Sequence, residues 1–167
     1  MSPTRRSPSL DVGAALLRAY SASARVNQYL VERLHPAVWR ADPPAPRVRP
    51  IAALVAHLHN CGLVYLRRAA SGGRVPAELD RFHVTRAQAA RALGAKRKAV
   101  LTIAAAALDG AGRIDGFQYD AVGFLAYYMV HDGHHRGQIL TLARLLGHPV
   151  SIETMSGMWQ WGKRAKE

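Results

Sequence analysis

Apolar residues recur at spacings of three and four along most of the chain, which is the repeat of helices that bury one face. The first such window runs from about Leu10 to Leu34, and Asp11 stands where its side chain can cap the first turn. The prolines that follow, beginning at Pro36, cannot continue a helix. The pattern therefore predicts a first helix that ends before Pro36.

The next two windows predict two further long helices. The second begins near Pro50, which is tolerated as a first helical residue, and runs to the Ser-Gly-Gly at 71–73. Its middle is apolar nearly all round, as expected for an element buried on several sides. The third is rich in Ala and Arg, begins after a capping Thr85 and ends around Gly110.

A fourth long helix is predicted from near Phe117 to Gly147, with Pro149 just beyond as a stop. The tail, from about Ile152 to Lys163, contains two tryptophans and predicts a short docked helix. Few segments alternate with the period of a strand. Four long helices joined by connections of these lengths are typical of a four-helix bundle with crossover links.

The chain length of 167 residues and the apolar share of 49 % fit one globular domain. We therefore predict an all-α fold, a single four-helix bundle over residues 10–167 with a short C-terminal helix. Residues 1–9 are expected to form a flexible N-terminal tail, because they lack the apolar repeat.

The charge balance is strongly basic, with 23 Lys and Arg against 11 Asp and Glu. A net charge of +12 is compatible with nucleic acid, anionic membranes or acidic small molecules as partners. The basic residues are spread along the chain, however, and no aromatic motif of the single-strand-binding type accompanies them. We interpret the charge as a solvated Arg-rich surface, so nucleic acid is not the expected partner.

Cellular location is predicted from three features. No apolar run approaches the ~20 residues needed to cross a bilayer. The N-terminal segment has no apolar core of the kind found in secretory signals. Cys61 is the single cysteine, so no intramolecular disulfide can form, which fits a reducing compartment. The expected location is the cytoplasm, without membrane contact.

Five of the eight histidines fall into two clusters, His57 with His59, and His131 with His134 and His135. Residues four apart on a helix project about 40° apart, so His131 and His135 can share one metal ion, as in the HExxH helix of zinc enzymes. Spacing alone does not decide whether His131 pairs with His134 or with His135.

His57 and His59 project about 200° apart on a helix, so they cannot both face one site. One of them is expected to face inward and the other to lie near the surface. Apolar residues surround both, so the pattern does not choose between them. Burying three imidazoles without a partner is costly, which favours a metal site over three structural histidines.

The segment HDGHHRGQILTLARLLGHP at 131–149 resembles the signature helix of the DinB superfamily, in which a His, three residues and a His followed by Arg-Gly-Gln recur. IAALVAHLHNCGLVYL at 51–66 resembles the second-helix segment of the same superfamily (the DinB/YfiT-like proteins). FLAYYMVHDGHH at 124–135 and MWQWGKR at 158–164 extend the likeness over most of the chain.

The resemblance implies an up-down-down-up four-helix bundle with one divalent metal ion at one end. It implies that His57 of the second helix and His131 and His135 of the fourth are the ligands. Some relatives are thiol-dependent transferases or isomerases that use a low-molecular-weight thiol such as bacillithiol or mycothiol, and the family tends to form homodimers. This chain differs from the pattern at Asp132, where Glu is common, and at Gly62, where Arg often stands.

Three imidazoles would leave open positions on a metal ion, which is typical of a catalytic rather than a structural metal site. Such a metal lowers the pKa of a bound water or thiol, so that the thiolate can attack an electrophile at neutral pH. Zinc is the expected occupant, with nickel, iron and manganese as alternatives, because imidazoles do not discriminate strongly among them.

Neighbouring polar residues are candidates for supporting roles. Asp132 and Gln138 are placed to orient an imidazole N–H, although a solvated helix residue is the favoured interpretation for Asp132. His134 flanks the metal-binding face. Arg136 either attracts an acidic substrate or thiol cofactor, or is a surface charge.

Cys61 lies four residues after His57 on a shared face, so it is a candidate ligand or redox thiol. The favoured interpretation is a small buried core residue, because free cysteine behaves as a hydrophobe.

Three other functions are compatible with the sequence. HDGHH could be a variant zincin helix of a metallohydrolase, with Asp132 replacing the Glu base, although no third-ligand motif follows. The chain could be a nucleic-acid-binding bundle with structural histidines. It could also be a metal-binding protein without catalytic activity.

Overall fold

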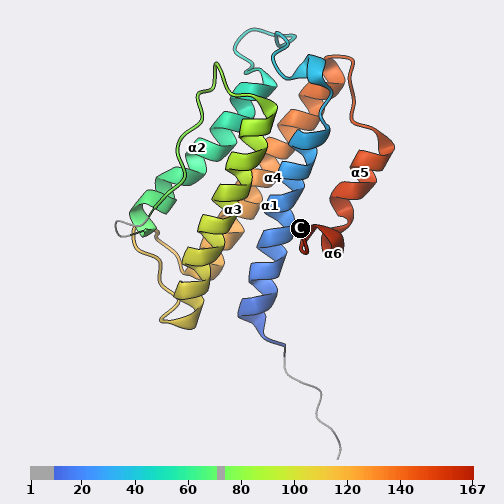
Figure 1. The fold of residues 1–167 in the computed structure, drawn as a ribbon. Coiled ribbons are helices and arrows are strands. Elements are labelled where there is room, and N and C mark those ends of the chain that lie inside the picture. The colour runs from blue at the N-terminus through green and yellow to red at the C-terminus, as the bar shows by residue number, and fades with distance from the viewer. Residues whose placement is uncertain (1–9, 71–73) are drawn as a thin grey trace, which may run out of the picture.

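Four long helices run side by side in the computed structural model, which describes residues 10–70 and 74–167 (Figure 1). They are α1 (Val12–Arg33), α2 (Ile51–Ala69), α3 (Arg86–Asp109) and α4 (Ala121–Leu145). α1 and α4 run in one direction and α2 and α3 in the other, which is the up-down-down-up order (Figure 1). No strand occurs within the two described ranges, so the predicted all-α bundle is confirmed. The tail predicted at 1–9 and the predicted helix end at 71–73 lie outside them.

Side-chain caps fix where the long helices begin. Asp11 Oδ1 accepts a hydrogen bond from the Ala14 amide at 2.9 Å, as the sequence predicts. Thr85 and Gln88 exchange side-chain and backbone hydrogen bonds in a capping box at the start of α3. The fourth helix starts at Ala121 rather than near Phe117, because Asp120 accepts from the Gly123 amide and caps it there.

The C-terminal segment forms two short helices, α5 (Ile152–Trp159) and α6 (Trp161–Arg164), instead of the one predicted. Both pack on α1, and the contact centres on Tyr29. A Cβ atom on Gly157 would lie 2.0 Å from the Tyr29 hydroxyl oxygen, so only glycine permits this approach. Trp159 is 76 % exposed, so the docked side of the tail is not its tryptophan side.

Two apolar clusters make up the core. One includes Leu30, Val55 and Leu93, and lies toward the end of the bundle where α2 and α3 begin. The other lies toward the opposite end and includes Tyr20, Leu66, Val100 and Phe124. Between them, at intermediate positions on their helices, lies a buried polar layer made by Asn27 of α1, Lys96 of α3 and Asp132 of α4.

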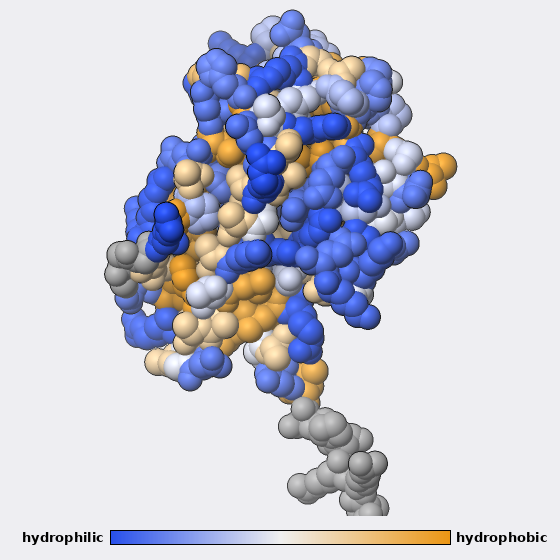
Figure 2. All heavy atoms as spheres, in the orientation of Figure 1, coloured by the Kyte–Doolittle hydropathy of each residue, from blue (hydrophilic) through white to orange (hydrophobic). Residues whose placement is uncertain are grey.

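The bundle is ordered so that α1 and α2 each pack against both α3 and α4. A 3-10 turn, η1 (Pro36–Val38), begins the connection from α1 to α2. Hydrophilic residues cover most of the face seen in Figure 2, and apolar residues gather in its lower middle. Within the described part of the chain, no helix has the length and apolar character needed to cross a membrane.

Candidate metal centre

Three imidazole rings meet between α2 and α4. His131 and His135 stand one turn apart on α4, and their ring centroids are 4.6 Å apart. His57 approaches from α2, with its ring centroid 4.8 Å from that of His135 and 6.2 Å from that of His131. The structure therefore brings together the three residues that the sequence singled out, and we call them the histidine cluster.

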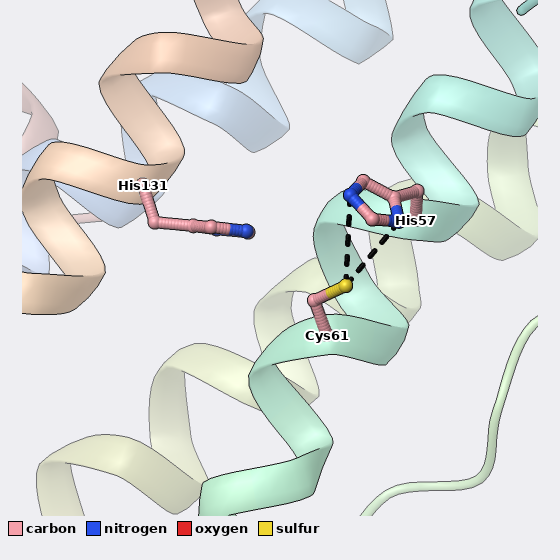
Figure 3. A group of neighbouring side chains, drawn as sticks. All are labelled: His57, Cys61 and His131. Carbon is pink, nitrogen blue, oxygen red and sulfur yellow. Dashed lines mark hydrogen bonds between the residues drawn. The ribbon is translucent and has the colours of Figure 1, made fainter.

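The Cys61 thiol adjoins this cluster. Its Sγ lies 3.2 Å from His57 Nδ1, one helical turn along α2, and the His131 ring extends toward both from α4 (Figure 3). Potential ligand atoms of His57, Cys61 and His131 all lie within 4.8 Å of one another, so this group could hold a metal ion. The interpretation of Cys61 as a buried core residue is wrong, because its side of α2 faces imidazoles and is only half-buried.

The remaining two clustered histidines lie elsewhere. His134 is exposed on α4, and its ring centroid is 5.0 Å from that of His135. His59 is fully buried on another face of α2, where its Nε2 lies 2.9 Å from the Ala77 carbonyl oxygen. His59 is therefore the inward member of the pair, covered by the connection from α2 to α3, whereas His57 is only half-buried and lies nearer the surface, as expected for two residues on opposite sides of a helix.

Burial keeps two members of the cluster neutral. Burial lowers the pKa of His57, and the nearby charges of Arg49, His135 and His131 lower it further. Burial also lowers the pKa of His135, against the opposing effect of a hydrogen bond with Gln138. Both imidazoles are therefore neutral at pH 7, which is the form that binds metal ions.

Asp132 is a member of the polar layer and not a solvated residue. Its Oδ1 accepts a hydrogen bond from Lys96 Nζ at 3.0 Å, and its Oδ2 accepts one from Asn27 Nδ2 at 2.9 Å. Burial raises the pKa of Asp132, but Lys96 and His131 outweigh burial and hold that pKa below its usual range. The interpretation of Asp132 as a solvated helix residue is therefore wrong.

The Asp132 carboxylate also lies close to the histidine cluster. Asp132 Oδ1 lies 3.7 Å from His131 Nδ1, which is too long for a hydrogen bond but close enough for electrostatic attraction. A negative charge at this nitrogen favours a proton there and leaves Nε2 of His131 with its lone pair.

Sequence reasoning missed Lys96. Its side chain is buried, and Nζ also donates a hydrogen bond to the Leu58 carbonyl oxygen at 3.1 Å. Gly62 leaves the room that this requires, since a Cβ atom there would lie 2.8 Å from Lys96 Cδ. The available signal was its place on α3, three residues after Leu93 and four before Val100, on the apolar side of the helix.

The last two predicted neighbours point in different directions. Gln138 Oε1 lies 2.7 Å from His135 Nδ1, next to the cluster. Arg136 turns toward α1, where its Nη1 donates to Asn27 Oδ1 at 2.9 Å and to the Ser23 carbonyl oxygen at 3.3 Å. Its observed hydrogen bonds therefore join the polar layer rather than the cluster.

The family model of the DinB superfamily matches residues 19–139, which include the histidine cluster and most of the bundle. The chain therefore belongs to the DinB superfamily, as its motifs indicate. Neither the curated proteins nor the solved structures contain a match to it.

Proposed function

We propose that this protein holds one divalent metal ion through His57, His131 and His135 and acts as a metal-dependent enzyme of thiol chemistry. The observation that carries the proposal is the meeting of three imidazoles from two helices, with the pKa values of His57 and His135 lowered. The reaction class is an S-transferase or isomerase reaction with a low-molecular-weight thiol, as in some DinB relatives.

The donor set fits a divalent metal ion such as zinc, or nickel, iron or manganese. Neutral imidazole is a ligand common to all of these ions. Gln138 Oε1 can accept the Nδ1 proton of His135, and Asp132 favours a proton on Nδ1 of His131. Both rings would then present Nε2 as the ligand atom.

A bound metal ion would supply the positive charge that lowers the pKa of a thiol at an open position. The chain's own part is to hold and orient the imidazoles. With three histidines as the protein ligands, a position stays open for the thiol.

A second donor set is favoured by the distances around Cys61. His57, Cys61 and His131 carry the atoms that lie within 4.8 Å of one another. If Cys61 joined all three histidines, four protein ligands would close the site, as in structural zinc sites. The role of Cys61 therefore decides between an open and a closed centre.

The metallohydrolase alternative finds no support in the geometry. A general base must reach the proton that it abstracts. Asp132 is instead buried, and both of its oxygens are hydrogen-bonded within the bundle, to Lys96 and Asn27.

The test of the metal site is elemental analysis of untagged protein and single variants. His57→Ala, His131→Ala and His135→Ala should each abolish tight binding of one ion per chain. His134→Ala is the matched control, since it removes a neighbouring imidazole that lies outside the cluster, and it should retain the metal. Loss of metal from His134→Ala but not from His135→Ala would refute the proposed ligand set.

Cobalt substitution separates the open from the closed centre. In the three-histidine site, Cys61→Ser should leave the metal content and the cobalt(II) absorption spectrum unchanged. A thiolate-to-cobalt charge-transfer band that disappears in Cys61→Ser would instead make Cys61 a ligand. Catalysis is tested by screening thiols with electrophiles using metal-loaded and chelated protein. Turnover that is equal in the two forms would contradict metal dependence.

A further inference from the structure

An open groove of about 690 Å³ lies beside the histidine cluster. One wall is the last turns of α4, and the other is the segment 44–49 that leads from η1 to α2. His135 and Gln138 belong to the lining, so the groove reaches the cluster. Its volume lies within the range of about 300–1,000 Å³ that is usual for small-molecule sites.

Most of the groove's lining surface is apolar. Leu54 of α2 and Leu142 of α4 are buried there, while Leu145 is 64 % and Val48 43 % exposed. Large apolar side chains that line a concave surface next to reactive groups are the usual wall of a ligand site. The groove therefore suits a ligand with an apolar body.

Arg47 and Arg49 are the groove's charged residues, and the described lining contains no Asp or Glu. Both arginines are exposed. Guanidinium groups bind carboxylates in a bidentate, charge-assisted geometry.

The backbone at Arg47 supports a specific presentation of this residue. Its φ angle is 65°, in the left-handed region where residues other than glycine are uncommon. Non-glycine residues held in this region tend to occur at functional sites, where the surrounding structure maintains them. Glycine would be the unstrained choice here, yet the chain has an arginine beside the groove.

We propose that this groove binds a small organic acid, with its apolar body against Leu54 and Leu142 and its carboxylate paired with Arg47 and Arg49. Such an acid is the substrate class that would meet the activated thiol, and this part of the inference rests on the proposed function. The histidine cluster lies at one edge of the groove, so one ligand can contact the arginines and approach the cluster together.

The test uses 2-naphthoate and its neutral analogue 2-naphthamide, titrated calorimetrically into metal-free protein. Removing the metal is essential, because a carboxylate could otherwise bind the ion directly. The wild-type protein should bind the acid at least tenfold more tightly than the amide. Arg47→Gln/Arg49→Gln should abolish this preference while the affinity for the amide stays within twofold.

Arg144→Gln/Arg18→Gln is the matched control, because it removes two exposed positive charges outside the groove. It should keep the preference for the acid. Equal affinities for acid and amide, a preference that survives in Arg47→Gln/Arg49→Gln, or no binding of either probe would each overturn the proposal.

Elemental analysis of the same variants separates this proposal from the metal site. Arg47→Gln/Arg49→Gln should retain one ion per chain. A protein that holds no metal but prefers the acid would leave the groove proposal standing and remove the proposed function. Normal metal content without a preference for the acid would remove the groove proposal and leave the proposed metal site standing.

Discussion

Replacing Lys96 with methionine removes the cation of a buried ion pair while keeping a side chain of similar length. In the wild-type protein, Nζ bonds both Asp132 Oδ1 and the Leu58 carbonyl oxygen, and the Lys96 and Asp132 side chains are 1 % and 2 % exposed. The variant leaves the Asp132 carboxylate in the core with the Asn27 amide as its remaining hydrogen-bond partner. Lys96→Met is therefore a direct test of the polar layer.

The expected loss follows from the isolation of a buried charge. Removing one partner of a buried pair costs about 3–5 kcal/mol of unfolding free energy. For a chain of this size, that corresponds to a fall in melting temperature of roughly 6–20 °C. Without Lys96, burial dominates and the pKa of Asp132 rises, so the carboxyl group takes up a proton at a higher pH. The variant should therefore lose less stability at pH 5 than at pH 7.5.

Urea unfolding of metal-free protein measures these effects without a contribution from bound metal. Asp132→Leu leaves the buried Lys96 ammonium without its carboxylate partner, so it should also lower the unfolding free energy strongly. The double variant Lys96→Met/Asp132→Leu removes both charges, so its loss should be smaller than the sum of the single losses by at least about 1 kcal/mol. A loss below 1 kcal/mol for Lys96→Met at pH 7.5, or strict additivity in the double variant, would refute this account of the pair.

Four further results are expected. Gly62→Ala should lower the unfolding free energy by about 1–3 kcal/mol in urea titrations, because its Cβ would meet Lys96 Cδ at 2.8 Å. Thr85→Ala should lower the unfolding free energy by about 1 kcal/mol in the same assay, because it removes the capping box of α3. An unchanged urea midpoint would contradict a stabilising effect of this cap. Metal-free protein should lose stability as pH falls below about 6.5, because the unfolded chain binds protons that folded His57 and His135 resist. Protons also compete with the metal ion for the imidazoles, so chelator should lower the melting temperature more at pH 7.5 than at pH 5. An equal chelator effect at both pH values would contradict a histidine site. Light scattering at micromolar concentration should give the mass of a homodimer, and a monomer would contradict that expectation.

The helices could be predicted because periodicity and caps are local properties of the chain. Asp11 and Thr85 cap their helices as the sequence indicates, and the family pattern supplied the order of the bundle. The apolar pattern predicts the start of α4 too early, because the turn before Asp120 contains aromatic residues that continue this pattern without being helical. The division of the tail at Gln160 had no recognised signal in its composition.

The approach of His57 to His131 and His135 could be expected only with the family resemblance, because spacing left other pairings open. The environment of Asp132 could not be predicted, since it depends on Lys96, which is 36 residues away in sequence on a different helix. Residue type alone predicts a core position for Cys61, whereas its surroundings are set by the α4 side chains that face it. These misses share one cause, which is that contacts between helices decide the environment of a polar residue.

The polar layer also restricts how the helices can slide along one another. Apolar contacts are non-directional, so they discriminate weakly against a shift of α3 along α4 by one turn, about 5.4 Å. Such a shift would separate the Lys96 ammonium from the Asp132 carboxylate inside the core. Buried polar groups in helical assemblies can select one alignment in this way. The double variant Lys96→Met/Asp132→Leu, whose loss of stability is smaller than the sum of the single losses, would also lose this selection, and a shifted α4 would carry His131 out of reach of His57.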